Sequence, residues 1–348
     1  MNNNTPKDRL MAHLEGEEVD RAPAFSAMGN FIWTSAEDMG LPFYEIFEEP
    51  ESASEILRKP LELYGYENVS CPIDMNIVAE AFGATVSFYR DKDRDKVMYP
   101  TVSEEIVDSP EDYSTIEAPD VAEAGRIPYV IETIKKLKEK VGPDIPVCGW
   151  IMGPFVSSGQ MGELSELYKA TVKHPDAVHS LISEVTGFQI EYAKWMKEAG
   201  ADFISLREPG ASQDTLSRRM FEEFAQPYLT EILENIPGHT VLHICGLTDN
   251  IVDLMVECGP DGISVEQKNN LAENRETLDE EFEEHVNLYG GELGPYETLK
   301  NGSPGEIEKK VKKAYQDGAD VPMPGCDVWP EAPLKNMEAL VDSIKKYG

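Results

Sequence analysis

Short apolar segments alternate with helix-length segments along most of this chain of 348 residues. Each apolar segment has the length of a buried strand, whereas the segments between them repeat their apolar residues every three or four positions, as amphipathic helices do. The segment 130–141 is an example, with the sequence VIETIKKLKEKV. Eight apolar segments can be distinguished: residues 22–28, 68–75, 147–154, 201–209, 240–246, 262–268, 286–293 and 320–327. This α/β alternation predicts a parallel sheet covered by helices, and eight units predict a closed (β/α)₈ TIM barrel.

Two parts of the chain depart from this alternation. Before the first apolar segment, Thr5 is placed to cap an additional N-terminal helix, with Pro6 at its first position and Gly16 after its end. Between residues 84 and 126, ATVSFY and VMYPTV flank the charged sequence RDKDRDK, which predicts a hairpin and a loop insertion on one rim of the barrel. The sequence shows no repeat and no linker composition, so we expect a single elaborated domain over residues 1–348.

The charge of the chain limits its partners. Asp and Glu number 65 against 31 Lys and Arg, which gives a net charge of −34. A potential this negative repels nucleic acid and acidic membrane surfaces, and it is typical of a solvated surface in high salt. The N-terminal sequence has no signal-peptide pattern, and no run of eighteen apolar residues occurs. We therefore expect a cytoplasmic protein with no nucleic-acid or membrane partner.

The sequence HICG contains the most specific chemical signal. Side chains two positions apart on a strand share one face, so His243 and Cys245 can converge at the end of the 240–246 segment. Cys326 occupies the same end of the last segment, and active sites of barrels lie at that end. One imidazole and two thiolates suit Zn²⁺ with a fourth position left open, as in catalytic sites. The alternative is a packed cysteine beside a hydrogen-bonded histidine.

The remaining cysteines and one carboxylate are further candidates for metal ligands. Cys258, near the end of a helix, competes as a ligand but is more typical of a buried structural thiol, as are Cys71 and Cys148 within apolar segments. Glu266 ends the 262–268 segment at the same mouth. We expect Glu266 to fill the fourth metal position while substrate is absent and then to accept the proton of a substrate thiol, although a supporting or surface carboxylate is the alternative.

Four further residues are candidates for substrate binding. Arg207 ends the 201–209 segment and could bind an anion, but a salt bridge at the barrel rim, for instance with the adjacent Glu208, is the alternative. Asp74 could orient substrate or solvent. Trp150 and Met152 could line a cavity that faces a large ligand, but such residues are also common in a core.

The chain resembles the uroporphyrinogen decarboxylase superfamily and, within it, the methylcobalamin:coenzyme M methyltransferases of methanogenic archaea. The resemblance runs nearly from end to end and is carried by TPKDRLMAHLEGEEVDRAP, AGRIPYVIETIKKLKEKVGPDIPV, VLHICG, DGISVEQK and PGCDVWPEAPLKNMEALV. It implies a (β/α)₈ barrel and a catalytic zinc on His243, Cys245 and Cys326, with Glu266 nearby. It further implies methyl transfer from a corrinoid (methylcobalamin), carried by a separate corrinoid protein, to the thiol of coenzyme M in methylotrophic methanogenesis.

Three other functions remain open at this stage. The same chemistry could serve another acceptor, such as a different thiol or tetrahydrofolate. A uroporphyrinogen decarboxylase would need arginines at the end of the first segment, where the sequence PAFSAMGNFIW has none and Arg21 precedes it instead. A non-catalytic corrinoid-binding protein would use zinc as a structural clamp, which calls for four protein ligands.

Overall fold

The computed structural model describes residues 5–37, 40, 42–90 and 98–348. Its centre is a parallel sheet in the order β1-β4-β5-β6-β7-β8-β9. These strands are β1 (Val69–Cys71), β4 (Val147–Met152), β5 (Phe203–Arg207), β6 (His239–Ile244), β7 (Gly262–Val265), β8 (Asn287–Gly290) and β9 (Val321–Pro322). Seven of the eight expected segments therefore contain strands, in chain order around the sheet, as a parallel barrel requires.

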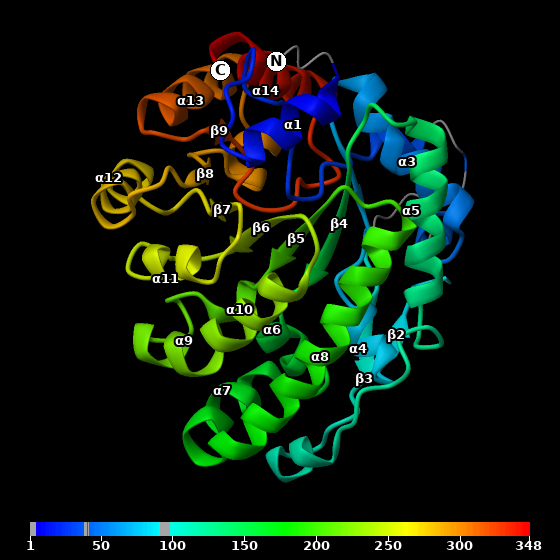
Figure 1. The fold of residues 1–348 in the computed structure, drawn as a ribbon. Helices are drawn as coiled ribbons and strands as arrows, with labels where there is room; N and C mark the ends of the chain where they lie inside the picture. The colour runs from blue at the N-terminus through cyan, green and yellow to red at the C-terminus, as the bar shows by residue number, and fades with distance from the viewer. Residues whose placement is uncertain (1–4, 38–39, 41, 91–97) are drawn as a thin grey trace.

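Helices cover the outside of these strands, as Figure 1 shows. The helices of eight residues or more are α1 (Pro6–Leu14), α3 (Pro50–Leu63), α5 (Ile127–Val141), α7 (Leu164–Lys173), α8 (Pro175–Ala199), α10 (Gln226–Asn235), α12 (Leu271–Glu281), α13 (Pro304–Gln316) and α14 (Leu334–Tyr347). Shorter ones are α2 (Thr34–Glu37), α4 (Ile77–Ala81), α6 (Pro154–Gly159), α9 (Arg218–Phe224) and α11 (Val252–Glu257). Short 3₁₀ segments occur at Phe43–Phe47, Pro110–Thr115 and Pro209–Ala211, and a π-helical segment occurs at Pro295–Lys300. Within the part of the chain described, no helix combines the length and apolarity needed to cross a membrane.

The prediction of a strand at residues 22–28 is wrong, but the segment does lie between β9 and β1. Ser26 exchanges two hydrogen bonds with the side chain of Asn68, each 2.9 Å long. On its other side, the amide of Ala27 donates to the sulfur of Met323 at 3.3 Å. Because side chains take the backbone partners that a neighbouring strand would supply, no regular ladder forms here.

The barrel interior is filled by rings from two strands and from the irregular segment 22–28. Phe25 packs edge-to-face on Tyr289, with ring centroids 5.2 Å apart, and on Phe203 at 6.1 Å. All three side chains are fully buried. Filling the interior below the carboxyl ends of the strands leaves only that end open for a site.

The two departures from the alternation are confirmed. Thr5 accepts a hydrogen bond from the amide of Asp8 at 3.0 Å and caps α1, and Gly16 follows the helix with φ of 71°. The predicted hairpin is the antiparallel pair β2 (Thr85–Ser87) and β3 (Thr101–Glu104). Most of its charged turn, residues 91–97, lies outside the described residues.

Candidate metal centre and adjoining cavity

The structure brings together His243, Cys245 and Cys326. The Nε2 atom of His243 lies 3.0 Å from the sulfur of Cys245, which in turn lies 3.3 Å from the sulfur of Cys326. The three ligand atoms all lie within 4.8 Å of one another, close enough to hold one metal ion. Among the described residues no other group of three or more such side chains has this geometry. The β6 and β9 ends therefore meet at the mouth of the barrel, as the sequence predicted.

Cys258, Cys71 and Cys148 are all fully buried. The thiol of Cys258 donates to the carbonyl of Leu254 within its own helix at 3.2 Å. Burial raises the pKa of Cys258 and Cys148, each to about 12. Such thiols stay protonated at neutral pH, which favours the structural interpretation of these residues.

The two clustered thiols influence each other's protonation. A hydrogen bond from Cys245 lowers the pKa of Cys326 to about 5 against the opposing effect of burial. The same hydrogen bond, together with burial and the negative charges nearby, raises the pKa of Cys245. These opposite shifts favour the thiolate form at Cys326, and the thiolate is the form that binds metal.

Ser264 on β7 orients the imidazole. Its hydroxyl lies 3.1 Å from Nδ1 of His243, and the two residues are directly paired in the β6/β7 register. A proton on Nδ1 directed to Ser264 leaves the Nε2 lone pair facing the two sulfurs. Our sequence reasoning missed Ser264, although it stands two positions before Glu266 and therefore on the same face of its strand.

Glu266 lies beside the cluster rather than within it. Its carboxylate accepts hydrogen bonds from the amide of Gly246 at 2.5 Å and from the side chain of Gln267 at 3.2 Å. Gly246, with φ of 101°, turns the chain immediately after Cys245 and so directs this amide towards Glu266. Its negative charge also contributes to raising the pKa of Cys245, so the carboxylate is electrically coupled to the ligands.

Arg207 is held by protein groups at the centre of the mouth. Its guanidinium pairs with Asp327 at 3.0 Å, donates to the carbonyl of Ala27 at 2.5 Å and lies 4.2 Å from the ring of Trp150. Its side chain is 3% exposed. The salt-bridge alternative is therefore the observed arrangement, but the partner is Asp327, 120 residues away, and the suggested partner Glu208 is wrong.

Glu208 points away from Arg207 towards the start of α6. Its carboxylate accepts hydrogen bonds from the amides of Phe155 at 2.8 Å, Val156 at 3.0 Å and Gly210 at 3.2 Å. Complete burial raises the pKa of Glu208 to about 8, although these three amides oppose the shift. Glu208 therefore fixes the β5 and α6 ends to each other at the wall of the mouth.

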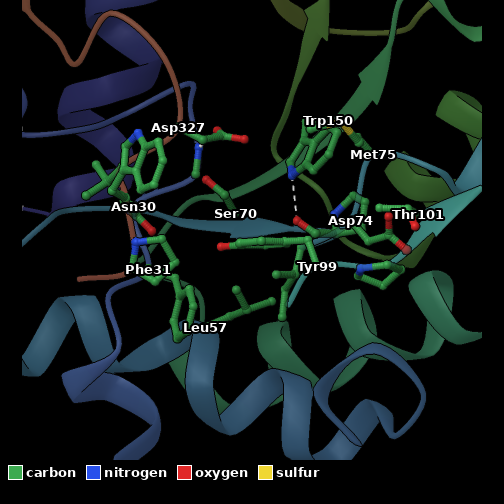
Figure 2. A pocket seen from close by; sticks show the side chains of 17 residues that line it. Asn30, Phe31, Leu57, Ser70, Asp74, Met75, Tyr99, Thr101, Trp150 and Asp327 are labelled. Atoms are coloured by element: carbon green, nitrogen blue, oxygen red, sulfur yellow. Dashed lines mark hydrogen bonds between the residues drawn. The ribbon is translucent and has the colours of Figure 1, made fainter. Parts of the chain in front are cut away.

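A cavity of about 410 Å³ lies at the mouth on the β1 and β4 side, and Figure 2 shows the residues that line it. Asp74 and Trp150 line it, whereas Met152 is not among the lining residues and packs instead with Trp150 and Val156. Trp150 is fixed by a hydrogen bond from its indole to the carbonyl of Pro72 at 2.5 Å. Asp74 is ion-paired with Arg126 and is 2% exposed, and its role in orienting substrate stays a prediction.

Asp327 connects the cavity to the cluster. It lines the cavity, follows Cys326 directly in the chain, and accepts from the amide of Gly29 as well as pairing with Arg207. Sequence reasoning did not single it out, because a lone Asp after a ligand gives no sign of a partner 120 residues earlier.

Comparisons with known proteins cover nearly the whole chain. Residues 5–347 match the uroporphyrinogen decarboxylase (URO-D) family. The chain belongs to that family. It is 33% identical to the methylcobamide:CoM methyltransferase MtaA of Methanosarcina barkeri, over 99% of this chain and 98% of the relative. It is 30% identical to the methylcobamide:CoM methyltransferase MtbA of Methanosarcina acetivorans, over 99% and 98% respectively.

The fold of this URO-D family member is also that of a solved relative. A methyltransferase from Methanosarcina mazei superimposes with a TM-score of 0.90 at 32% identity, covering 99% of both chains. The TIM-barrel prediction is thereby confirmed, with residues 22–28 as its irregular segment. The predicted membership of the methyltransferase group within the URO-D superfamily is confirmed as well.

Proposed function

We propose that this protein transfers a methyl group from a methylated corrinoid to the thiol of coenzyme M, using a zinc ion held by His243, Cys245 and Cys326. The observation that carries the proposal is the convergence of one imidazole and two thiols at the carboxyl ends of parallel strands. The methylcobamide:CoM methyltransferases that the chain resembles over its full length support the donor and the acceptor. We include in the proposal a cytoplasmic location and a separate corrinoid protein as partner.

The donor set fits zinc. Two sulfurs and one nitrogen are borderline-soft ligands, and three protein ligands leave one tetrahedral position for substrate. When bound, the ion would lower the pKa of a coordinated thiol and so supply a thiolate nucleophile at neutral pH. Such a site requires the neutral tautomer of His243 that carries its proton on Nδ1 and donates it to the hydroxyl of Ser264.

We propose that Glu266 accepts the proton of the acceptor thiol and that it would occupy the fourth metal position when substrate is absent. Its carboxylate is held by the amide of Gly246, the residue that follows Cys245 in the chain. The acceptor thiol gives its proton to this carboxylate, and its sulfur then forms the bond to the methyl carbon. The carbon–cobalt bond breaks at the same time, and its electron pair stays with the corrinoid. Exchange of a carboxylate for a thiolate leaves the charge of the site unchanged, which limits the electrostatic cost in a buried position.

The decisive experiment is a methyl-transfer assay with free methylcobalamin, offered coenzyme M and tetrahydrofolate in parallel, on protein of known metal content. We expect one zinc per chain and transfer to coenzyme M alone. Transfer to tetrahydrofolate alone would mean that tetrahydrofolate, and not coenzyme M, is the methyl acceptor. One zinc whose coordination gains no sulfur when coenzyme M is added, with no transfer, would support a structural clamp instead.

The Glu266 assignment is tested with Glu266→Gln. We expect this variant to keep its zinc, to release less proton on thiol binding than the wild type at the same pH, and to turn over more slowly. Unchanged proton release and unchanged turnover would contradict the assignment.

A further inference from the structure

The loops that follow β6 and β7 are joined by one buried side chain. Asn269, four residues after the end of β7, is 9% exposed. Its side-chain nitrogen donates to the carbonyl of Gly246 at 2.9 Å and to the carbonyl of Glu266 at 3.0 Å. Its side-chain oxygen accepts from the amide of Thr248 at 2.6 Å. Asn269 therefore connects the chain that follows Cys245 to the main chain of Glu266.

A side-chain amide of this length suits the connection. An amide carries two N–H donors and one carbonyl acceptor, and Asn269 uses all of them in these bonds. An aspartate would offer no donor to the two carbonyls, and a serine would offer a single donor. The carbonyl of Glu266 also accepts from the backbone amide of Asn269 at 3.1 Å, which closes the turn after β7. The residue type at position 269 thus fixes the spacing of the two loops.

The same two loops meet at the carboxylate of Glu266. That carboxylate accepts a hydrogen bond from the amide of Gly246 at 2.5 Å, while the carbonyls of both residues accept from Asn269. The three bonds form a closed ring of contacts among Asn269, Gly246 and Glu266. A shift of the Glu266 main chain relative to Gly246 therefore stretches at least one bond to Asn269.

A weaker contact holds Glu266 on the β9 side. The side-chain nitrogen of Gln267 donates to the carboxylate of Glu266 at 3.2 Å, but the side-chain oxygen of Gln267 has no hydrogen-bond partner among the residues described. That oxygen lies against Gly325, where an added Cβ atom would collide with it. Because Gln267 uses only part of its hydrogen-bonding capacity and Asn269 uses all of it, Asn269 is the stronger anchor of Glu266.

We propose that Asn269 is a positioning residue for the proton acceptor Glu266. This inference rests on the proposed function, in which Glu266 takes the proton of the acceptor thiol. The side chain of Asn269 bonds to main-chain groups of the two loops, so it acts on the reaction through the place of Glu266 relative to Cys245. Proton transfer depends steeply on that place, since a displacement of about 1 Å can cost about a hundredfold in rate.

Steady-state kinetics of Asn269→Ala test the proposal against a matched control. Asn270→Ala makes the same chemical change one position later, where the side chain accepts from the amide of Glu273 at 3.4 Å and caps α12. Both variants lose a structural contact, but Asn269→Ala also loosens Glu266. We expect Asn269→Ala to lower kcat roughly tenfold to a hundredfold, with both KM values changed by less than about twofold and wild-type zinc content. Asn270→Ala should keep the wild-type kcat.

A double-mutant cycle shows whether Asn269 acts through Glu266. In the Glu266→Gln background, Asn269→Ala should lower kcat by less than about twofold, because the group that it positions is already gone. Equal losses in both backgrounds would overturn the proposal, since Asn269 would then act independently of Glu266. Loss of zinc in Asn269→Ala would also overturn it, because the side chain would then serve to hold the ligand Cys245.

The variant Asn269→Asp separates the donor and acceptor roles of the side chain. An aspartate keeps an acceptor for the amide of Thr248 but has no donor for the carbonyls of Gly246 and Glu266. We expect Asn269→Asp to have a kcat as low as that of Asn269→Ala. A wild-type kcat in Asn269→Asp would contradict the proposal, because the bonds to the two carbonyls would then be dispensable.

Amide hydrogen exchange measures the same contacts without metal or turnover. Mass spectrometry of peptides that cover residues 246–250 follows the amides of Gly246 and Thr248 in zinc-free and zinc-loaded protein. Asn269→Ala removes the acceptor of the Thr248 amide and loosens the bond from Gly246, so exchange should become roughly tenfold faster in both forms. Asn270→Ala should leave the exchange unchanged. Wild-type exchange in Asn269→Ala would overturn the inference.

The outcomes separate this inference from the proposed function. Faster exchange in Asn269→Ala together with no methyl transfer by the wild type would uphold the geometric role of Asn269 and overturn the function. Methyl transfer by the wild type with an unchanged kcat in Asn269→Ala would leave the function standing and overturn the inference.

Discussion

The two sides of the barrel mouth are built differently. On the β6, β7 and β9 side, three candidate ligand atoms lie within 4.8 Å of one another, and the hydroxyl of Ser264 lies 3.1 Å from Nδ1 of His243. On the β1 and β4 side lies an apolar cavity whose charged wall residues are neutralised by arginines. The first side depends on the identity of a few donor atoms, and the second depends on shape and apolar area. Under our proposed function the first side activates the acceptor thiol.

Arg207 and Asp327 stand between the two sides. The arginine belongs to β5 and stacks on Trp150 of the cavity wall, while its partner Asp327 is adjacent to the ligand Cys326. Damage confined to one side should therefore leave the other intact, whereas damage to this pair should affect both.

The largest expected effect follows loss of a metal ligand. Cys326→Ala should lose its zinc and reduce methyl transfer at least roughly a thousandfold, since activation of a thiol by a metal is worth several kcal/mol. Metal analysis and the methylcobalamin assay measure this. Cys258→Ala, a change at a buried thiol outside the cluster, is the control and should keep zinc and activity. Retention of zinc by Cys326→Ala would refute the assignment of the ligand.

Removal of the central pair should come next. Arg207→Met should lower the free energy of unfolding by about 2 kcal/mol, less than for a fully buried pair because Asp327 is 41% exposed. Urea denaturation measures this, and Arg218→Met, at an exposed pair with Asp253, should cost well under 1 kcal/mol. The variant should also weaken both zinc and methylcobalamin binding. An effect on one ligand alone would show that the pair belongs to one side only.

A smaller effect is expected from the imidazole support. Ser264→Ala removes the partner of His243 Nδ1 and should weaken zinc binding roughly tenfold, as for other outer-shell hydrogen bonds to metal ligands. A competition titration with a chelator measures the affinity. The Kd for methylcobalamin should remain that of the wild type, and a matching loss there would break the distinction between the two sides.

The smallest effect concerns pH. Because burial raises the pKa of Glu208 to about 8 from its ordinary 4.5, the folded protein retains a proton there that the unfolded chain has released. This contribution to stability is complete below about pH 4.5 and is lost as pH rises towards 8. The Tm, measured at a series of pH values, should therefore fall less steeply between pH 6 and 8.5 in Glu208→Gln than in the wild type. Parallel curves would mean that the three amides keep this carboxylate ionised.

The sequence predicted much of the fold because alternating periodicity is a local property. Seven strands, the capped first helix and the hairpin could all be recognised from short stretches. Residues 22–28 have the composition of a strand, but the side chain of Asn68 occupies backbone positions that a ladder would need. This use of a side chain in place of a strand partner depends on a residue 42 positions away, so it cannot be recognised within the segment itself.

The candidate site was predictable to the extent that side-chain alternation places residues at strand ends. His243, Cys245 and Cys326 could be brought together on that basis, since parallel strands end at the same mouth. The partner of Arg207 was predicted wrongly because sequence neighbours on a strand point to opposite faces, so Glu208 was unable to reach it. The pairing of Asp327 with Arg207 and the packing of Tyr296 on Trp329 depend on approaches between distant loops, which periodicity does not encode.

The proposed ligand set is divided between the end of β6 and the segment after β9, and this division has a consequence for biosynthesis. In the chain, three strands separate Cys326 from Cys245, and Cys326 lies close to the C-terminus. The ribosome therefore synthesises His243 and Cys245 well before the third proposed ligand. Ion capture would then be among the last events of maturation. A chain truncated before Cys326 would lack the third proposed ligand and would bind the ion poorly at any metal concentration.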